Sequence, residues 1–172
     1  MIKYELYCDG STKTNPGIGA WAAILKTCGR EIIYTKTYEL TTNNRMELLG
    51  IIEPLEKIAD SSGWGKEDQV SVHIYSDSRY ALDALFKYFN GWVKNGWRTS
   101  SGKPVKNIDL LIRANKVLHM LKWCAHTWVK GHADNEYNNR CDVLARDRLV
   151  EEHKYVDREY VGGVDKTPEL VI

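Results

Sequence analysis

The chain has 172 residues, of which 43% are hydrophobic, and its formal net charge at pH 7 is +1. This size and composition suit one domain with a buried core and exclude an intrinsically disordered chain. The four cysteines include no Cys-x-x-Cys pair, and neither a secretory block nor a run of membrane-spanning length is present. We therefore expect no structural zinc, no membrane contact and a cytoplasmic location.

Three segments near the start of the chain have the alternating pattern of half-buried strands. They comprise residues 2–9, 19–26 and 30–38. Because only short links join them, they are predicted to pair antiparallel as a meander. A helix is predicted over residues 43–60, with a buried stripe at helical spacing formed by Leu48, Ile51, Ile52, Leu55, Ile58 and Ala59. Pro54 lies inside this helix and is expected to kink it.

The rest of the chain alternates between strands and helices. Residues 69–77 are a predicted strand, which should run parallel to its neighbour because a helix intervenes. The segments that follow are a helix at 78–89, a basic and aromatic stretch at 91–97, a helix at 107–122, a strand at 125–131, a polar loop at 132–139 and a helix at 140–153. No internal repeat or interdomain linker is present.

The charges are unevenly distributed along the chain. Residues 84–133 contain nine Lys and Arg side chains and a single acid, Asp109, whereas both flanking regions carry net negative charge. Such asymmetry indicates one surface for a polyanion and another for cations such as metal ions.

Acidic residues follow the predicted strands at corresponding places. Asp9 and Asp77 each end a strand, two residues after Tyr7 and Tyr75. If the two strands are parallel neighbours, both carboxylates lie at the carboxyl edge of the sheet, where α/β folds usually bind ligands. Glu47 and Asp142, each predicted near the start of a helix, can reach the same edge.

Each of these acids also has a purely structural interpretation. Asp9 can serve only to turn the chain, and Asn44 with Glu47 can form a capping box. Asp77 can cap the helix that follows it, and Asp142 can complement a helix dipole. Taken together, however, four converging carboxylates would repel one another without a cation. Oxygen ligands in that number suit Mg²⁺ or Mn²⁺.

Several motifs occur in the order and spacing of one known family. They are YCDGS at 7–11, NPG at 15–17, TTNNRMEL at 41–48, YSDS at 75–78, KPVKNIDL at 103–110, and WVKGHA with NNRCDVLA within 128–145. From about Tyr4 to Arg148 the chain resembles type 1 ribonuclease H of the bacterial type. The resemblance implies an α/β, ribonuclease H-like fold: a five-stranded mixed sheet of order 3-2-1-4-5, with the first three strands antiparallel and helices on both faces. It implies a ribonuclease H domain at residues 1–152, with a basic protrusion at about 90–108. Residues 153–172 form an unassigned extension, either docked or disordered.

The same resemblance implies the chemistry. The family hydrolyses the RNA strand of RNA/DNA hybrids with two metal ions and leaves 5′-phosphate and 3′-hydroxyl ends. Matching the motifs assigns metal binding and catalysis to Asp9, Glu47, Asp77 and Asp142. His132 matches a loop histidine that assists proton transfer or product release, although a solvated loop residue is its alternative interpretation.

The positions that match hybrid contacts form two groups. Near the acids they are Gly10, Ser11, Asn15, Thr42, Asn43, Asn44 and Arg79; in the protrusion they are Trp92, Lys94, Trp97, Arg98, Lys103 and Lys106. Core packing is the alternative for the two tryptophans. The implied cofactor is two Mg²⁺ ions, with Mn²⁺ as the alternative, and the partner is an RNA/DNA hybrid bound by a monomer; a replication protein as a further partner is left open. A hybrid-binding module without catalysis is the alternative function.

Overall fold

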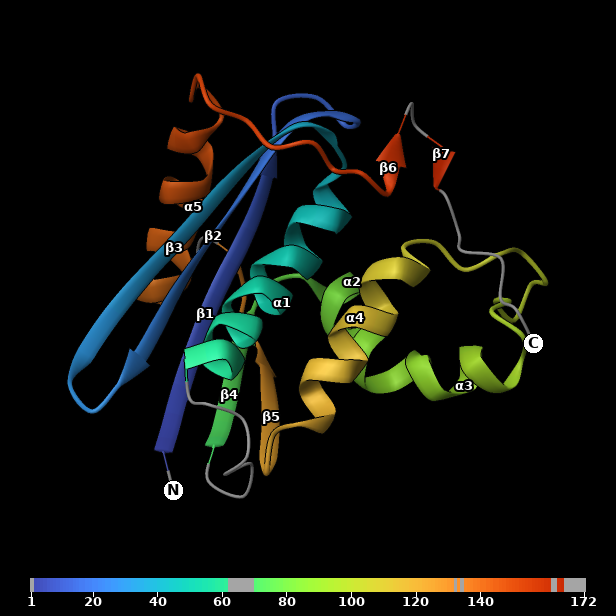
Figure 1. The fold of residues 1–172 in the computed structure, drawn as a ribbon, viewed down its shortest axis with the longest axis horizontal. Helices are drawn as coiled ribbons and strands as arrows, with labels where there is room; N and C mark the ends of the chain where they lie inside the picture. Colours follow the sequence, from blue (N-terminus) through green and yellow to red (C-terminus); the bar gives the residue numbers. More distant parts are fainter. Residues whose placement is uncertain (1, 62–69, 132, 134, 162–163, 166–172) are drawn as a thin grey trace.

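A five-stranded mixed sheet forms the centre of the molecule (Figure 1). The computed structural model describes residues 2–61, 70–131, 133, 135–161 and 164–165. The strands are β1 (Ile2–Thr12), β2 (Gly17–Thr27), β3 (Arg30–Thr41), β4 (Val70–Ser76) and β5 (Trp123–Trp128), in the order β3-β2-β1-β4-β5. The first three pair antiparallel, whereas β4 runs parallel to β1 and β5 parallel to β4. This order and these directions confirm the predicted sheet.

Helices cover both faces of the sheet. On one face lie α1 (Asn43–Ser61) and α4 (Ile108–His119), and on the other lies α5 (Glu136–Arg148) (Figure 1). Successive side chains of β1 point to opposite faces of the sheet and contribute to two hydrophobic clusters. Leu6 and Cys8 belong to the larger cluster under α1, whereas Tyr7 packs with Cys141 and Ala145 of α5. Among the described residues, no helix has the length and apolar character that a membrane span requires.

The buried stripe predicted for α1 is confirmed. Its six residues, from Leu48 to Ala59, are all at most 9% exposed. Pro54 lies inside α1 but does not end it, because the helix runs from Asn43 to Ser61. As a proline, residue 54 has no N–H to donate to the Gly50 carbonyl. A Cβ atom at Gly50 would lie 3.4 Å from Cys8 Cβ, an ordinary van der Waals contact, so α1 packs against β1 at this position without requiring glycine.

The helix predicted for residues 78–89 continues beyond its expected end. It comprises α2 (Arg79–Leu82), a π-helical segment η2 (Asp83–Tyr88) and α3 (Phe89–Lys94). Gly91 therefore lies within the helical stretch, and Gly96, with φ of 61°, ends it. The Trp97 N–H donates to the Trp92 carbonyl at 2.8 Å and the Gly96 N–H to the Val93 carbonyl at 3.3 Å. This pattern is a Schellman motif, for which glycine is the preferred left-handed residue.

The last helix begins earlier than predicted. It runs from Glu136 to Arg148, so the prediction of a loop over 136–139 and of a helix from 140 to 153 is wrong at both ends. The Asn135 side chain accepts a hydrogen bond from the Asn138 N–H at 2.9 Å and caps the helix. Asp142 consequently lies nearly two turns inside α5, too far from its start to complement the helix dipole.

Residues after α5 pack against the sheet. The Tyr155 N–H donates to the Thr37 carbonyl at 2.8 Å, and the Glu39 N–H donates to the Tyr155 carbonyl at 2.9 Å. A short pair of strands follows, β6 (Tyr160–Val161) and β7 (Val164–Asp165). The described part of the extension is therefore docked, whereas residues 162–163 and 166–172 lie outside the described residues.

Candidate active site and nucleic-acid surface

Three of the four predicted acids meet at the carboxyl edge of the sheet. β1 and β4 are in parallel register up to the pair Tyr7–Tyr75, so Asp9 and Asp77 follow at corresponding positions. Glu47 reaches the same edge from the first turns of α1. One carboxylate oxygen of each of these three residues lies within 4.8 Å of the others.

The start of α1 positions Glu47. The Thr42 hydroxyl accepts a hydrogen bond from the Arg45 N–H at 3.4 Å, and the Thr42 carbonyl accepts one from the Met46 N–H. The helix thus starts at Asn43, and the interpretation of Asn44 as the cap of a capping box is wrong. Instead, Asn43 Nδ2 donates to Glu47 Oε1 at 3.2 Å.

Gly10 allows β1 to approach this turn of α1. A Cβ atom there would lie 2.7 Å from the Glu47 backbone nitrogen, a distance that real Cβ atoms do not tolerate. The Gly10 N–H also donates to Asp9 Oδ1 at 2.8 Å. Glycine after Asp9 therefore brings two of the acids together.

Asp77 lies just beyond β4 and is not needed as a helix cap. The Ser78 hydroxyl accepts from the Ala81 N–H at 3.1 Å and caps α2, so the structural interpretation of Asp77 as the cap is wrong. Trp128 Nε1 donates to the Asp77 carbonyl at 2.9 Å. A Cβ atom at Gly131 would lie 2.5 Å from Asp77 Oδ2, so the chain after β5 packs directly on this carboxylate. Sequence reasoning did not single out Trp128 or Gly131, although both belong to the WVKGHA motif.

Asp142 lies beside the three acids but outside their cluster. Its carboxylate forms an ion pair with Arg146 one helical turn along, at 2.6 Å. Its negative charge still raises the pKa of Asp9, and the charge of Arg146 lowers it. The structure thus places the fourth predicted acid near the other three and already paired.

Burial and mutual repulsion favour the neutral form of two of the acids. Burial is the main cause that raises the pKa of Asp9 to about 7, and the charge of Asp77 is the next. Burial followed by the charges of Asp9 and Asp77 raises the pKa of Glu47 well above its usual range. Glu47 Oε2 is buried and has no hydrogen-bond partner within the described residues. Crowded carboxylates with an unpaired buried oxygen fit a divalent cation that takes oxygen ligands.

These pKa shifts predict how pH affects the metal-free protein. In the folded state Asp9 keeps its proton up to about pH 7, whereas its ordinary pKa is 3.8. The folded state therefore binds more protons than the unfolded state between these values, so stability decreases as pH rises. In EDTA, we expect the melting temperature to fall on the order of 5 °C between pH 5 and pH 8, and Mg²⁺ to reverse the fall.

The control for this experiment is Asp9→Asn, which removes one titrating group from the cluster. Its melting temperature should depend less on pH than that of the unaltered protein. Equal pH dependence of the two proteins would contradict the assignment of the effect to Asp9.

Polar side chains that match hybrid contacts surround the acids. The Asn15 side chain, on the loop after β1, accepts a hydrogen bond from the Asn43 N–H at 3.2 Å, so this loop and α1 present a shared surface. Asn44 is exposed, and Ser11, Thr42 and Asn43 are half-buried. The guanidinium carbon of Arg79 lies 3.9 Å from the ring centre of Trp128, which places this cation near Asp77.

The predicted protrusion presents its cations to solvent. Lys94, Arg98, Lys103 and Lys106 are all exposed, and no ion pair joins any of them to a carboxylate of the described residues. Arg98 donates to the Gly102 carbonyl at 3.0 Å. The described residues thus hold a cationic surface without local compensation.

The two tryptophans of the protrusion differ in exposure. Trp97 is 8% exposed and packs edge-to-face on Phe89, with ring centres 5.6 Å apart. This geometry favours the packing alternative for Trp97. Trp92 is half-buried and packs against Tyr88, so part of its ring is open to solvent. The predicted catalytic His132 lies outside the described residues.

Comparison with known proteins decides the family. The RNase H family model matches residues 2–150. The chain belongs to the RNase H family. It is 44% identical over 144 residues to Ribonuclease H of Enterobacter sp. (strain 638), covering 83% of this chain and 86% of that protein. It is 42% identical over 149 residues to Ribonuclease H of Citrobacter koseri, covering 85% and 89%.

Solved RNase H structures share the fold. The crystal structure of LC9-RNase H1, described as a type 1 RNase H with the type 2 active-site motif, aligns with a TM-score of 0.73 at 25% identity and covers 87% of this chain and 72% of that one. RNase H1 of Halobacterium salinarum NRC-1 aligns with a TM-score of 0.61 at 25% identity, covering 86% and 97%. The predicted family, fold and enzyme class are confirmed. Members of the RNase H family are metal-dependent, and this chain retains an acidic cluster.

Proposed function

We propose that this RNase H family member is an endoribonuclease that hydrolyses the RNA strand of RNA/DNA hybrids and leaves 5′-phosphate and 3′-hydroxyl ends. The observation that carries this conclusion is the convergence of Asp9, Glu47 and Asp77 beside a polar surface, in a chain 44% identical to Ribonuclease H of Enterobacter sp.. Bringing two buried carboxylates and the half-buried Asp77 together is unfavourable in a protein that only binds a hybrid. In a metal-dependent nuclease, the same three carboxylates would bind the divalent cations that the reaction requires.

The acids have distinct parts in this proposal. Asp9, Glu47 and Asp77 would hold Mg²⁺, with Asp142 completing the set after release from Arg146. Two such ions, when bound, would activate the attacking water and stabilise the leaving oxygen. Asn43 keeps one Glu47 oxygen fixed at 3.2 Å and leaves the other for the cation. The choice of Mg²⁺ over Mn²⁺ is part of the proposal.

The residues around the acids would bind and orient the hybrid. Amide and hydroxyl groups of Asn15, Thr42, Asn43 and Asn44 suit 2′-hydroxyl and phosphate oxygens of the RNA strand. Gly10 and Ser11 let the backbone approach that strand. We assign proton transfer or product release to His132, and phosphate contact to Arg79. A monomer, a cytoplasmic location and a domain boundary at residue 152 stay predictions.

The exposed cations of the protrusion predict a specific salt dependence. Changing Lys94, Arg98, Lys103 and Lys106 together to Ala should weaken hybrid binding, because each phosphate that a cation neutralises releases counterions. The slope of log affinity against log salt should flatten by up to ~0.9 for each phosphate that the variant no longer binds. Turnover at saturating hybrid should change little, since these side chains supply uniform binding. Binding measured at several salt concentrations checks this.

A control variant that loses cations outside the protrusion distinguishes the effect of the protrusion surface from the effect of net charge. Lys3, Lys57, Lys116 and Lys122 are exposed and lie outside the protrusion, and changing these four to Ala should leave the slope nearly unchanged. An unaltered slope in the protrusion variant, or a large loss of turnover, would contradict the phosphate-binding role.

Cleavage of labelled duplexes tests the proposed function. RNA/DNA, RNA/RNA and DNA/DNA duplexes of one sequence are incubated with Mg²⁺ or with EDTA, and the products are separated by length. We expect internal cuts in the RNA strand of the hybrid alone, and only with Mg²⁺. Binding without cleavage would favour the hybrid-binding module instead, and cleavage of DNA/DNA would overturn the assignment.

A further inference from the structure

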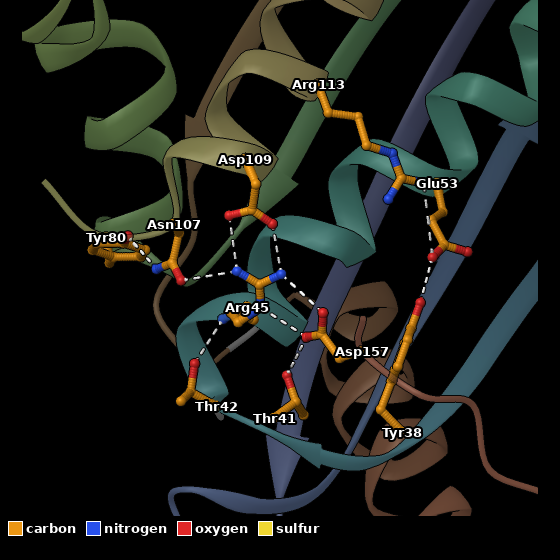
Figure 2. A network of polar contacts seen from close by, with 10 residues as sticks. All are labelled: Tyr38, Thr41, Thr42, Arg45, Glu53, Tyr80, Asn107, Asp109, Arg113 and Asp157. Atoms are coloured by element: carbon orange, nitrogen blue, oxygen red, sulfur yellow. Dashed lines mark hydrogen bonds and ion pairs between the residues drawn. The ribbon is translucent and has the colours of Figure 1, made fainter. Parts of the chain in front are cut away.

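Arg45, in the first turn of α1, has a completely buried guanidinium group. Figure 2 shows this group between the carboxylates of Asp109 and Asp157. An arginine side chain carries five N–H donors, and here all of them are used. Nε and Nη2 donate to the Asp157 carboxylate at 2.7 and 2.9 Å. Nη2 and Nη1 donate to the Asp109 carboxylate at 2.7 and 3.0 Å. Nη1 also donates to the Asn107 side-chain oxygen at 3.4 Å. Two bidentate carboxylates therefore fix both the position and the plane of the group.

The partners of Arg45 come from separate parts of the chain. Asp109 lies in the first turn of α4 and Asn107 just before it, directly after the cationic protrusion. Asp157 lies in the segment after α5, beyond residues 2–150 that match the RNase H family model. The guanidinium group thus ties the start of α1 to the start of α4 and to the C-terminal extension.

Asp157 is itself held in place. Its Oδ2 accepts a hydrogen bond from the Thr41 hydroxyl at 3.0 Å, and its carbonyl accepts one from the Tyr160 N–H at 2.9 Å. The Tyr160 ring centre lies 5.7 Å from the Arg45 guanidinium carbon. Asp157 is 7% exposed. The extension therefore presents this carboxylate from a packed and hydrogen-bonded position.

The turn that Arg45 anchors carries functional groups of the site. Asn43 and Glu47 lie two residues before and after Arg45, and the Asn43 amide holds the Glu47 carboxylate. Because the side chain of Arg45 is fixed on one face of the turn, the opposite face, with Glu47 against Gly10, is fixed as well. A displacement of this turn would therefore move the Glu47 carboxylate relative to Asp9 and Asp77.

We propose that Asp157 is a positioning residue of the active site, which acts through Arg45 to hold the first turn of α1 so that Glu47 faces Asp9 and Asp77. The inference rests on the proposed function, since it concerns the placement of a metal-holding carboxylate. It gives the extension a role in catalysis, although no described residue of the extension belongs to the acidic cluster.

The test compares Asp157→Asn and Asp157→Ala with a matched control. Glu56→Gln removes the ion pair between Glu56 of α1 and Arg113 of α4, which bridges the same helices away from the acids. Two quantities are measured where each variant is fully folded by circular dichroism: turnover at saturating hybrid, and the rise in melting temperature that Mg²⁺ causes without hybrid. Should Asp157→Ala not fold, Asp157→Asn and Thr41→Val, which removes the hydroxyl donor to Asp157, provide the comparison.

Loss of a group that orients a metal-holding residue typically lowers activity or metal affinity by ~10–100-fold. We expect turnover of the Asp157 variants to fall by about 10-fold and the Mg²⁺-induced rise in melting temperature to shrink, with smaller effects for Thr41→Val. Glu56→Gln should retain both. Asp157 variants that lose stability but keep wild-type turnover and the full Mg²⁺ effect would overturn the proposal. If the unaltered protein cleaves no hybrid, the proposed function fails, whereas the Mg²⁺ effect still decides whether Asp157 positions Glu47.

Discussion

Asp77→Asn should abolish most hybrid cleavage while leaving the fold intact. The exchange removes one negative charge from the group of three carboxylates within 4.8 Å. A metal ion contributes several kcal/mol to the stabilisation of charge in the transition state, so cleavage should fall by at least ~10³-fold. Folding should survive because Ser78 supplies the helix cap, and because the hydrogen bond from Trp128 uses the backbone carbonyl of Asp77, which the exchange leaves in place.

The measurement is the initial rate of hybrid cleavage at saturating Mg²⁺, together with the melting temperature in EDTA. The melting temperature should be unchanged or higher, since one of the mutually repelling charges is gone. Asp147→Asn, the same exchange on an exposed residue of α5, is the control and should cleave normally. Near-normal cleavage by Asp77→Asn would contradict its assignment to metal binding.

Of the substitutions considered for this protein, Arg45→Met should lower the free energy of unfolding the most. The substitution keeps a long side chain in the helix but leaves Asp109 and Asp157 together without their shared cation (Figure 2). Removing one partner of a buried ion pair typically costs ~3–5 kcal/mol, because the remaining charge stays desolvated. Urea unfolding of the metal-free protein measures this change as a lower midpoint.

The same substitution at an exposed ion pair gives the comparison. Arg140 pairs with Glu31 at 3.0 Å, and both side chains are more than one-third exposed. Arg140→Met should cost less than ~1 kcal/mol, as exposed pairs usually do. If the two substitutions cost the same, the network around Arg45 does not depend on its burial.

The sequence contained enough information for the sheet and for the three clustered acids. Alternating residues and short links define β1, β2 and β3, and the intervening helix forces β4 to run parallel to β1. Asp9 and Asp77 then lie at the same edge, since both follow a tyrosine at the same position of paired strands. These inferences depend on periodicity and chain connectivity, which are local properties of the sequence.

Helix ends were harder to predict because several residues compete for the same role. The helix predicted to end at residue 89 continues through Gly91 to Lys94, and the hydrogen bonds of Trp97 and Gly96 with the last turn end it there. The polar residues at 132–139 were typical of a loop, but Asn135 caps a helix that includes Asn138 and Asn139. The consequence for the site is that Asp142 lies further inside α5 than expected.

The contact between Arg45 and Asp157 joins residues 112 positions apart, so no local pattern pairs them. A weaker signal was nevertheless present. Arg45 precedes Leu48 by three positions and Ile52 by seven, so it continues the buried stripe of α1. An arginine on a buried stripe requires acidic partners, although the sequence does not identify which acids provide them.

The pairing of Tyr155 with β3 has a consequence for how separate copies of the protein meet. β3 is an edge strand, and the outward backbone groups of such a strand can add to an extended chain of another molecule. Here Tyr155 already occupies the Thr37 carbonyl and the Glu39 N–H. The extension thus shields part of the sheet from aggregation by strand addition, in addition to presenting Asp157.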